Sequence, residues 1–168
     1  DIYGSRISKT GAVLDPTGIT ISTANSYQYN PRIAVGGGNF MVAWQDYRYS
    51  SYANIYGARV SPAGVVLDKS GFLVSGASHH QYSPALAFDG TNFMVVWRDY
   101  RKTAGKYTRA DIFGARVSTS GTLLDKNGFQ ISTNGVLQYY PSISYSTNGA
   151  TYLVVWQEYR NLAKTYWD

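Results

Sequence analysis

The sequence PALAFDGTNFMVVWRDYR (residues 84–101) predicts two β-strands joined by a tight turn. Segments 84–88 and 92–100 are rich in β-branched and aromatic residues, which favour extended backbone. Asp89 and Gly90, which separate them, are residue types that hairpin turns select. No segment of the chain shows a helical spacing of apolar residues over a useful length. The sequence therefore predicts an all-β fold.

The same pattern occurs three times along the 168 residues. DIYGSRIS, NIYGARVS and DIFGARVS begin at Asp1, Asn54 and Asp111, and each is followed by a Leu-Asp turn, a short extended segment, Gln-Tyr-x-Pro and an apolar run ending in Trp. A fixed internal period of this kind indicates a repeat architecture. The predicted units are approximately 1–53, 54–110 and 111–167, and Asp168 begins a further unit.

Each unit predicts four short antiparallel strands, as in 84–88, 92–100, 111–118 and 122–124, with a further extended piece such as 129–132 leading to the next unit. Four strands in a repeat of about 53–59 residues are typical of a β-propeller blade. The predicted fold is a β-propeller of which three units are present. Closing the ring requires either oligomerisation, with a dimer giving six blades, or continuation in a longer chain.

The run P-A-L-A-F-D-G-T-N-F-M-V-V-W-R-D-Y-R, followed by D-I-F, resembles the TolB-type, PD40-like propeller repeats. Proline, an Asp-Gly turn, an apolar strand, arginine and Asp-Ile-aromatic follow in the order of that family. FDGTN stands where the family has a Ser-Pro-Asp-Gly turn, and GGGN and STNGAT stand there in the other units. The resemblance implies a propeller fold and specifies no activity.

Composition excludes several classes of function. The net charge of +5 comes from scattered basic residues, without the clustering that a nucleic-acid surface requires. No run approaches the roughly 18–20 apolar residues that span a bilayer, so no membrane span is predicted. The absence of cysteine excludes disulfides and thiolate metal sites. Richness in Tyr, Ser, Thr, Asn and Gly predicts an extracellular, cell-surface or periplasmic location.

An aromatic residue, an acid and an arginine recur in WQDYR, WRDYR and WQEYR. Alternate residues of a strand share one face, so the three side chains of each motif point the same way. A packed, hydrogen-bonded group that ties blades together is the favoured interpretation, and a repeated ligand site is the alternative. The residues are Trp44, Asp46, Arg48, Trp97, Asp99, Arg101, Trp156, Glu158 and Arg160.

The ten carboxylates argue against an enzyme, because nine of them belong to repeated sets and only Asp89 stands apart. A catalytic centre is expected to break the repeat. We therefore predict no catalytic residue, no enzyme activity and no cofactor. His79 and His80 are adjacent, and their side chains diverge on an extended chain, so we predict exposed loop residues and no metal site.

Long loops rich in tyrosine gather on one face of the predicted propeller, where binding residues are usually carried. The repeated Gln-Tyr pairs could bind a sugar once per blade, or could pack between blades with the glutamine bonded to backbone. The candidate ligand-binding residues are Gln28, Tyr29, Gln81, Tyr82, Gln138, Tyr139, Tyr49, Tyr52, Tyr107 and Tyr166.

The predicted function is a non-catalytic binding module for a glycan or a protein partner. The first alternative is a structural array that joins copies through open blade edges, and the second is an accessory fragment of a propeller enzyme.

Overall fold

The computed structural model describes residues 1–49, 51–103 and 109–159. These residues form twelve β-strands and no helix, which confirms the all-β prediction. The strands are β1 Ile2–Gly4, β2 Ile19–Ser22, β3 Gln28–Gly36, β4 Asn39–Asp46, β5 Asn54–Val60, β6 Phe72–Ser75, β7 Gln81–Phe88, β8 Asn92–Asp99, β9 Asp111–Ser118, β10 Phe129–Gln130, β11 Gln138–Ser146 and β12 Thr151–Glu158.

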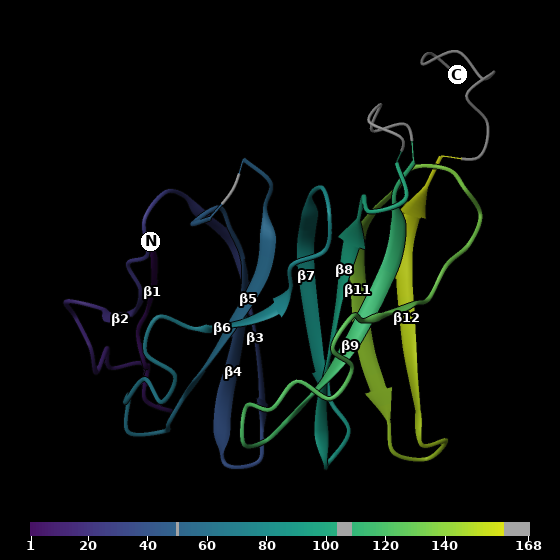
Figure 1. The fold of residues 1–168 in the computed structure, drawn as a ribbon. Helices are drawn as coiled ribbons and strands as arrows, with labels where there is room; N and C mark the ends of the chain where they lie inside the picture. Colours follow the sequence, from purple (N-terminus) through teal and green to yellow (C-terminus); the bar gives the residue numbers. More distant parts are fainter. Residues whose placement is uncertain (50, 104–108, 160–168) are drawn as a thin grey trace, which may run out of the picture.

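The strands form two complete antiparallel blades and two half-blades. The complete blades are β3-β4-β5-β6 and β7-β8-β9-β10, and the half-blades are β1-β2 and β11-β12. The first strands of successive blades, β3, β7 and β11, pack side by side (Figure 1). The chain therefore opens with strands three and four of one blade and ends, over the described residues, with strands one and two of another.

The fourth strand of each blade lies one segment later than predicted. The predicted segments 65–67 and 122–124 form only single bridges, Val60 to Val66 and Val117 to Leu123. The real fourth strands are β2, β6 and β10. The reason is the turn that follows, in which Asp68 accepts the Arg59 backbone N–H and Gly71 N bonds to the Asp68 carbonyl, so that the chain turns away before pairing extends.

The core lies between blades rather than inside one sheet. Met41, Ala43 and Ile55 of one blade pack against Phe93 and Val95 of the next, and all five are fully buried. A fully buried Met, Ile, Phe or Val side chain contributes about 1.5–3 kcal/mol relative to exposure, so these face-to-face contacts hold successive blades together.

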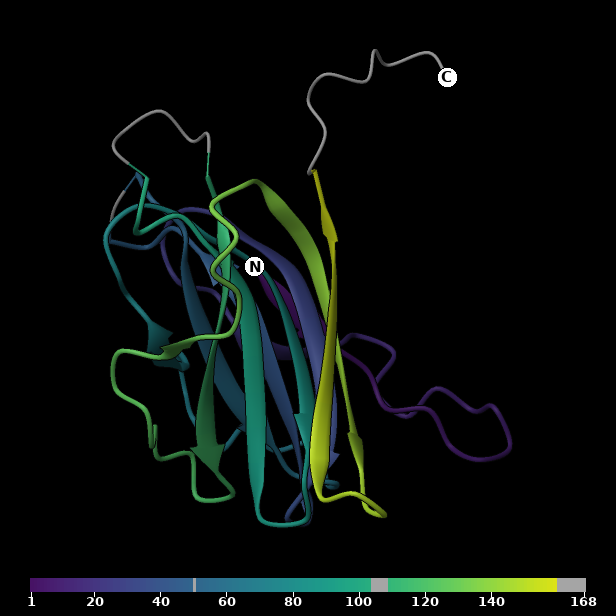
Figure 2. The ribbon, with the colours of Figure 1, turned by 90° about the vertical axis from the view of Figure 1, so that its right-hand side faces the viewer.

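The connections separate onto two faces of the molecule, which lie at the top and bottom of both Figure 1 and Figure 2. The hairpin turns of β3-β4, β7-β8 and β11-β12 lie at the bottom. The segments 23–27, 47–49, 51–53, 76–80, 100–103 and 131–137 lie at the top, and we call this end the loop face. The described part of the chain contains no helix that could span a bilayer.

Candidate functional site

The Trp-x-Asp-x-Arg motifs lie at the loop-face ends of β4 and β8. In the second blade, the Trp97 indole N–H donates to Asp99 Oδ2 at 2.7 Å, and Arg101 Nε donates to Asp99 Oδ1 at 2.9 Å. Arg101 continues to the Asn127 carbonyl of its own blade and to Ser75 Oγ of the preceding one. Both oxygens of the Asp99 carboxylate thereby accept hydrogen bonds from within the scaffold, which favours the structural interpretation.

The first blade repeats this arrangement. Trp44 and Arg48 both donate to the buried carboxylate of Asp46, and Arg48 reaches the Ser70 carbonyl and Ser22 Oγ. In the third unit, Trp156 Nε1 donates to Glu158 Oε2 at 3.0 Å. Arg160 lies outside the described residues.

The three predicted glutamines are buried and bonded within the protein. Gln28 donates to the carbonyls of Ala24, Asn25 and Ser26. Gln81 does the same in its own loop. Gln138 accepts the Ile112 backbone N–H at 3.1 Å instead. These contacts favour the interpretation that the glutamines support the loops.

The tyrosines, in contrast, form one connected cluster across the loop face. We call the cluster the aromatic belt, and it consists of Tyr27, Tyr29, Tyr47, Tyr52, His80, Tyr82, Arg98, Tyr100, Tyr139, Tyr140 and Tyr159. Tyr27 stacks on Tyr29 with ring centroids 5.7 Å apart, and Tyr29 meets the edge of Tyr47. Tyr47 contacts His80, which stacks on Tyr82 at 4.8 Å.

The belt continues across the second and third blades. Tyr82 meets Tyr100 edge-on, and the Arg98 guanidinium lies 5.0 Å from the Tyr82 ring centroid and 4.4 Å from that of Tyr139. Tyr139 then contacts Tyr140 and Tyr159. Rings from successive blades thus make a continuous surface, with Arg98 bridging the second and third blades.

The belt is exposed at both ends and half-buried in the middle. Tyr29 is 47% exposed and Tyr140 is 67% exposed, whereas Tyr82 and Tyr139 are half-buried. Burial and the Tyr47 hydroxyl raise the pKa of Tyr82, so its phenol stays protonated.

Tyr52 joins the belt through its contacts with the rings of His79 and His80. Tyr49 is 81% exposed on the same loop, and Tyr107 and Tyr166 lie outside the described residues.

Several belt residues were missed from the sequence, although a signal was present. Tyr47, Tyr100 and Tyr159 are the tyrosines inside WQDYR, WRDYR and WQEYR. Strand alternation places them opposite the tryptophan and the acid, on the side that the structural motif leaves available.

The two histidines are half-buried, so the prediction of exposed loop residues is wrong. The His80 ring packs between tyrosines, and its Nδ1 accepts the Ala53 backbone N–H at 3.0 Å. Burial, together with the positive charges of His79 and Arg98, lowers the pKa of His80. Among the described residues no three His, Cys, Asp or Glu side chains gather as a metal site would require.

A hollow of about 350 Å³ lies on the first strands of the blades, next to the belt. Arg32 of β3, Ser83 of β7 and Tyr140 and Ser142 of β11 line it. Ser83 and Tyr140 have left-handed backbone, with φ of 53° and 50°, at the bulge that follows each Gln-Tyr pair.

Asp89, the acid outside the repeated sets, lies at the face opposite the loop face. Its carboxylate accepts the backbone N–H groups of Thr91 and Asn92 and so caps its own turn.

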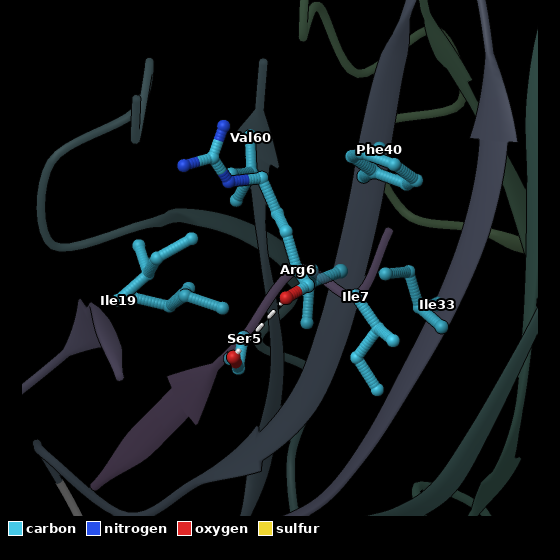
Figure 3. Close-up of a pocket in the computed structure, with 10 residues that line it drawn as sticks. Ser5, Arg6, Ile7, Ile19, Ile33, Phe40 and Val60 are labelled. Carbon is cyan, nitrogen blue, oxygen red and sulfur yellow. Dashed lines mark hydrogen bonds between the residues drawn. The ribbon is translucent and has the colours of Figure 1, made fainter. Parts of the chain in front are cut away.

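A second cavity, of about 340 Å³, is an apolar trough between the first half-blade and the first complete blade (Figure 3). Ile19, Ile33, Phe40 and Val60 line it, with Arg6 beside them. Its lining lacks the convergent polar groups that orient a small substrate.

No protein-family model matches the sequence, and neither does any curated protein. Solved structures do match. An α-L-arabinofuranosidase from Lactobacillus brevis is similar with a TM-score of 0.58 at 12% identity, over 86% of this chain and 49% of the other. The likeness shows the fold: a β-propeller.

Two further propellers match. A thermostable family-43 glycoside hydrolase has a TM-score of 0.56 at 13% identity, over 94% of this chain and 61% of its own. A Trypanosoma rangeli sialidase mutant displaying trans-sialidase activity has a TM-score of 0.52 at 9% identity, over 94% and 33%. The chain spans about half the length of the arabinofuranosidase and less than two thirds of the family-43 hydrolase.

These comparisons bear on two predictions: that the chain is not an enzyme, and that it resembles the TolB-type repeats. The prediction that the chain is not an enzyme is contradicted, because its structural neighbours are glycoside hydrolases and sialidases. A propeller can carry catalytic residues on its loops, so the repetition of the carboxylates does not exclude a catalytic centre. The TolB-type resemblance is supported only at the level of the propeller fold.

Proposed function

We propose that this chain contributes blades to a glycan-recognising propeller of the kind found in glycan-processing enzymes, with the aromatic belt as the glycan-contacting surface. The observation that carries the proposal is the continuity of the belt, whose rings come from successive blades and reach solvent at Tyr29 and Tyr140. The glycan chemistry of the structural neighbours supports it. An extracellular, cell-surface or periplasmic location remains a prediction that suits this ligand.

The chemistry of the belt suits sugars. A tyrosine ring offers a flat apolar face for the C–H groups of a pyranose and a hydroxyl for hydrogen bonding. Its side chain has few rotatable bonds, so binding costs little conformational entropy. Mutual ring contacts hold the half-buried tyrosines in place, while the hollow beside Tyr140 provides a concave floor.

The test is calorimetric titration of the chain with neutral and acidic oligosaccharides, together with hydrolysis assays on aryl glycosides. The double variant Tyr29→Ala/Tyr140→Ala is expected to weaken glycan binding about fivefold or more, because each lost aromatic contact is worth about 0.5–1.5 kcal/mol. Tyr3→Ala is the matched control, because Tyr3 is 53% exposed on β1, outside the belt. Failure of every glycan to bind, or equal loss in the control, would remove the proposal.

Self-assembly through the open blade faces is a second candidate function, favoured by the trough in Figure 3. Between the two complete blades, Met41 of β4 lies against Gly57, where an added Cβ would be 2.6 Å from Met41 Cε. The repeat makes Gly4 the equivalent of Gly57 and Leu153 the equivalent of Met41. Gly4 lines the trough, and Leu153 is 68% exposed on β12.

We infer that a second copy of this chain fits the trough. Leu153 and Val155 of one copy would occupy the places that Met41 and Ala43 occupy between complete blades. The edge of β12 that pairs with no other described strand would pair with β1 as β4 pairs with β5 and β8 pairs with β9. Each copy would thereby complete a blade of the other.

Light scattering over a concentration series tests this candidate. The unmodified chain is expected to form a dimer, and Leu153→Lys is expected to abolish it by placing a charge in the apolar trough. Leu14→Lys, at a residue that is 50% exposed on a turn, is the control and is expected to leave the dimer intact. A monomer at every concentration would rule out a second copy as the occupant, and open-ended growth would rule out a closed ring.

A further inference from the structure

We infer that the glycan recognised by the aromatic belt is acidic, and that Arg98 and Arg32 bind its carboxylate or sulfate groups. This inference rests on the proposed function, whose binding surface it makes more specific. The two arginines share one property in the described part of the chain: neither forms an ion pair, whereas Arg6, Arg48, Arg59, Arg101, Arg109 and Arg116 all do.

Arg98 breaks the repeat at a position with a defined structural task. The equivalent residue in the first unit is Gln45, and in the third it is Gln157. Gln45 Oε1 accepts the backbone N–H of Ser83 at 2.9 Å and so joins the first blade to the second. An arginine has no acceptor atom and cannot make that bond. The substitution therefore replaces the hydrogen bond between blades by a contact with the Tyr139 ring, and it adds a cation that the other two units lack at this position.

The surroundings of Arg98 hold its guanidinium in place and leave donors unused. The guanidinium carbon lies 5.0, 4.8 and 4.4 Å from the ring centroids of Tyr82, Tyr100 and Tyr139. Arg98 is half-buried, and its Nε is buried without a hydrogen-bond partner. An arginine immobilised by aromatic faces loses little entropy when it binds a planar anion through paired hydrogen bonds.

Arg32 breaks the repeat in the same region. Ala85 and Ser142 occupy the equivalent positions of the other units. Arg32 is exposed and lines the hollow on the first strands together with Ser83 and Tyr140. In the described structure its guanidinium bonds only to the carbonyl of its neighbour Pro31, at 3.0 Å. The hollow that Arg32 lines has a volume of about 350 Å³, which is large enough for a sugar unit.

The acids of the loop face do not neutralise these two arginines. Asp46, Asp99 and Asp111 are buried and paired with other arginines. Glu158 is engaged with Trp156 and Asn134. The available charge beside the belt is therefore positive, and guanidinium groups bind carboxylate and sulfate oxygens with fork geometry. Sugar rings stacked on Tyr29 and Tyr140 would bring such groups within reach of both arginines.

The experiment compares three probes of equal length: an oligogalacturonate, its methyl ester, and a sulfated galactan oligomer. The ester removes the charge and keeps the sugar and its linkage. The acidic probes are expected to bind about tenfold or more tightly than the ester, and added salt should reduce that advantage. The two acidic probes distinguish a carboxylate source from a sulfate source.

The variants use residues that the chain itself tolerates at equivalent positions. Arg98→Gln and Arg32→Ser are each expected to lose about tenfold in affinity for the acidic probe and little for the ester. Lys69→Gln removes the same charge from an exposed turn away from the belt and should change neither affinity. Thermal melts confirm that each variant is folded.

The outcomes separate the two proposals. Equal binding of acid and ester, or full affinity of Arg98→Gln and Arg32→Ser for the acidic probe, overturns the assignment of an acidic ligand and leaves glycan binding standing. Failure of all three probes and of neutral oligosaccharides overturns glycan binding itself. Selective loss of the acidic probe in the two arginine variants supports both.

Discussion

Arg59 donates a hydrogen bond from Nη1 to the carbonyl oxygen of Thr119, 3.1 Å away in the next blade. The same guanidinium is paired with Asp68 through two bonds of 2.8 Å. Arg6 repeats the arrangement one blade earlier, reaching the Pro62 carbonyl while its bonds to Asp15 lower the pKa of that acid to about 2. The repeated Arg-Asp pairs therefore aim a guanidinium at the adjacent blade, and this accounts for their recurrence.

Arg59→Gln is expected to destabilise the chain more than Arg116→Gln. Both arginines pair with an aspartate, but in the described structure only Arg59 continues into another blade. Loss of charged hydrogen bonds at the half-buried site should cost about 1.5–3 kcal/mol. The loss at the more exposed Arg116 pair should be smaller, because solvent screens that pair. Urea unfolding measures both, and equal losses would show that the interblade bond is unimportant.

Asp99→Asn is expected to cost about 3–5 kcal/mol, because it leaves Arg101 without its buried counter-charge. The Asp99 carboxylate is fully buried and accepts from Trp97 and from Arg101. Asp125→Asn, at a partly exposed pair, serves as the control and should cost about 1 kcal/mol or less. Equal melting temperatures of Asp99→Asn and Asp125→Asn would show that the Trp-x-Asp-x-Arg motif does not stabilise the blade. That result would favour the alternative interpretation of the motif as a ligand site.

Gly128→Ala is expected to be more damaging than Gly38→Ala. Both glycines have positive φ, of 62° and 76°, so each alanine adopts left-handed backbone at a cost of about 1–2 kcal/mol. At Gly128 the new methyl would also lie 2.8 Å from Trp97 Cη2, and overpacking adds about 1–3 kcal/mol. Nothing surrounds Gly38 within 4 Å. Thermal unfolding of the two variants compares them, and similar melting temperatures would contradict a packing role for the tryptophan.

The repeat made the blades predictable, because every unit contains the sequence patterns of the same strands and turns in the same order. Segments 84–88 and 92–100 were placed on adjacent strands from their residue types and the Asp-Gly turn alone. The fourth strand was misplaced, because the Arg59-Asp68 bonds end pairing after a single bridge, and side-chain bonds of this kind leave no trace in hydrophobic pattern.

The sequence predicted that tyrosines form the binding surface, but it did not identify all the residues that belong to it. Repetition pointed to Tyr29, Tyr82 and Tyr139, yet Arg98 joins them only because the third blade lies against the second. A contact of that sort depends on the angle between blades. The glutamines were selected but do not bind in this way. Gln81 has a suitable residue type and location, but its side-chain amide donates to the Ala77 and His79 carbonyls of its own loop.

Lowering the pH is expected to destabilise the belt through His80. Burial and the charges of His79 and Arg98 lower the pKa of His80 in the folded chain, while the unfolded chain takes up its proton near the ordinary value of about 6.5. The unfolded state therefore binds more protons as the pH falls below about 7, and stability declines until the folded pKa is passed. Above that range His80 is neutral in both states and has no such effect. His80→Tyr, which places the first unit's Tyr27 at the equivalent position, should flatten the fall in melting temperature between about pH 7.5 and about pH 5. Parallel curves for the two proteins would show that His80 does not couple proton binding to folding.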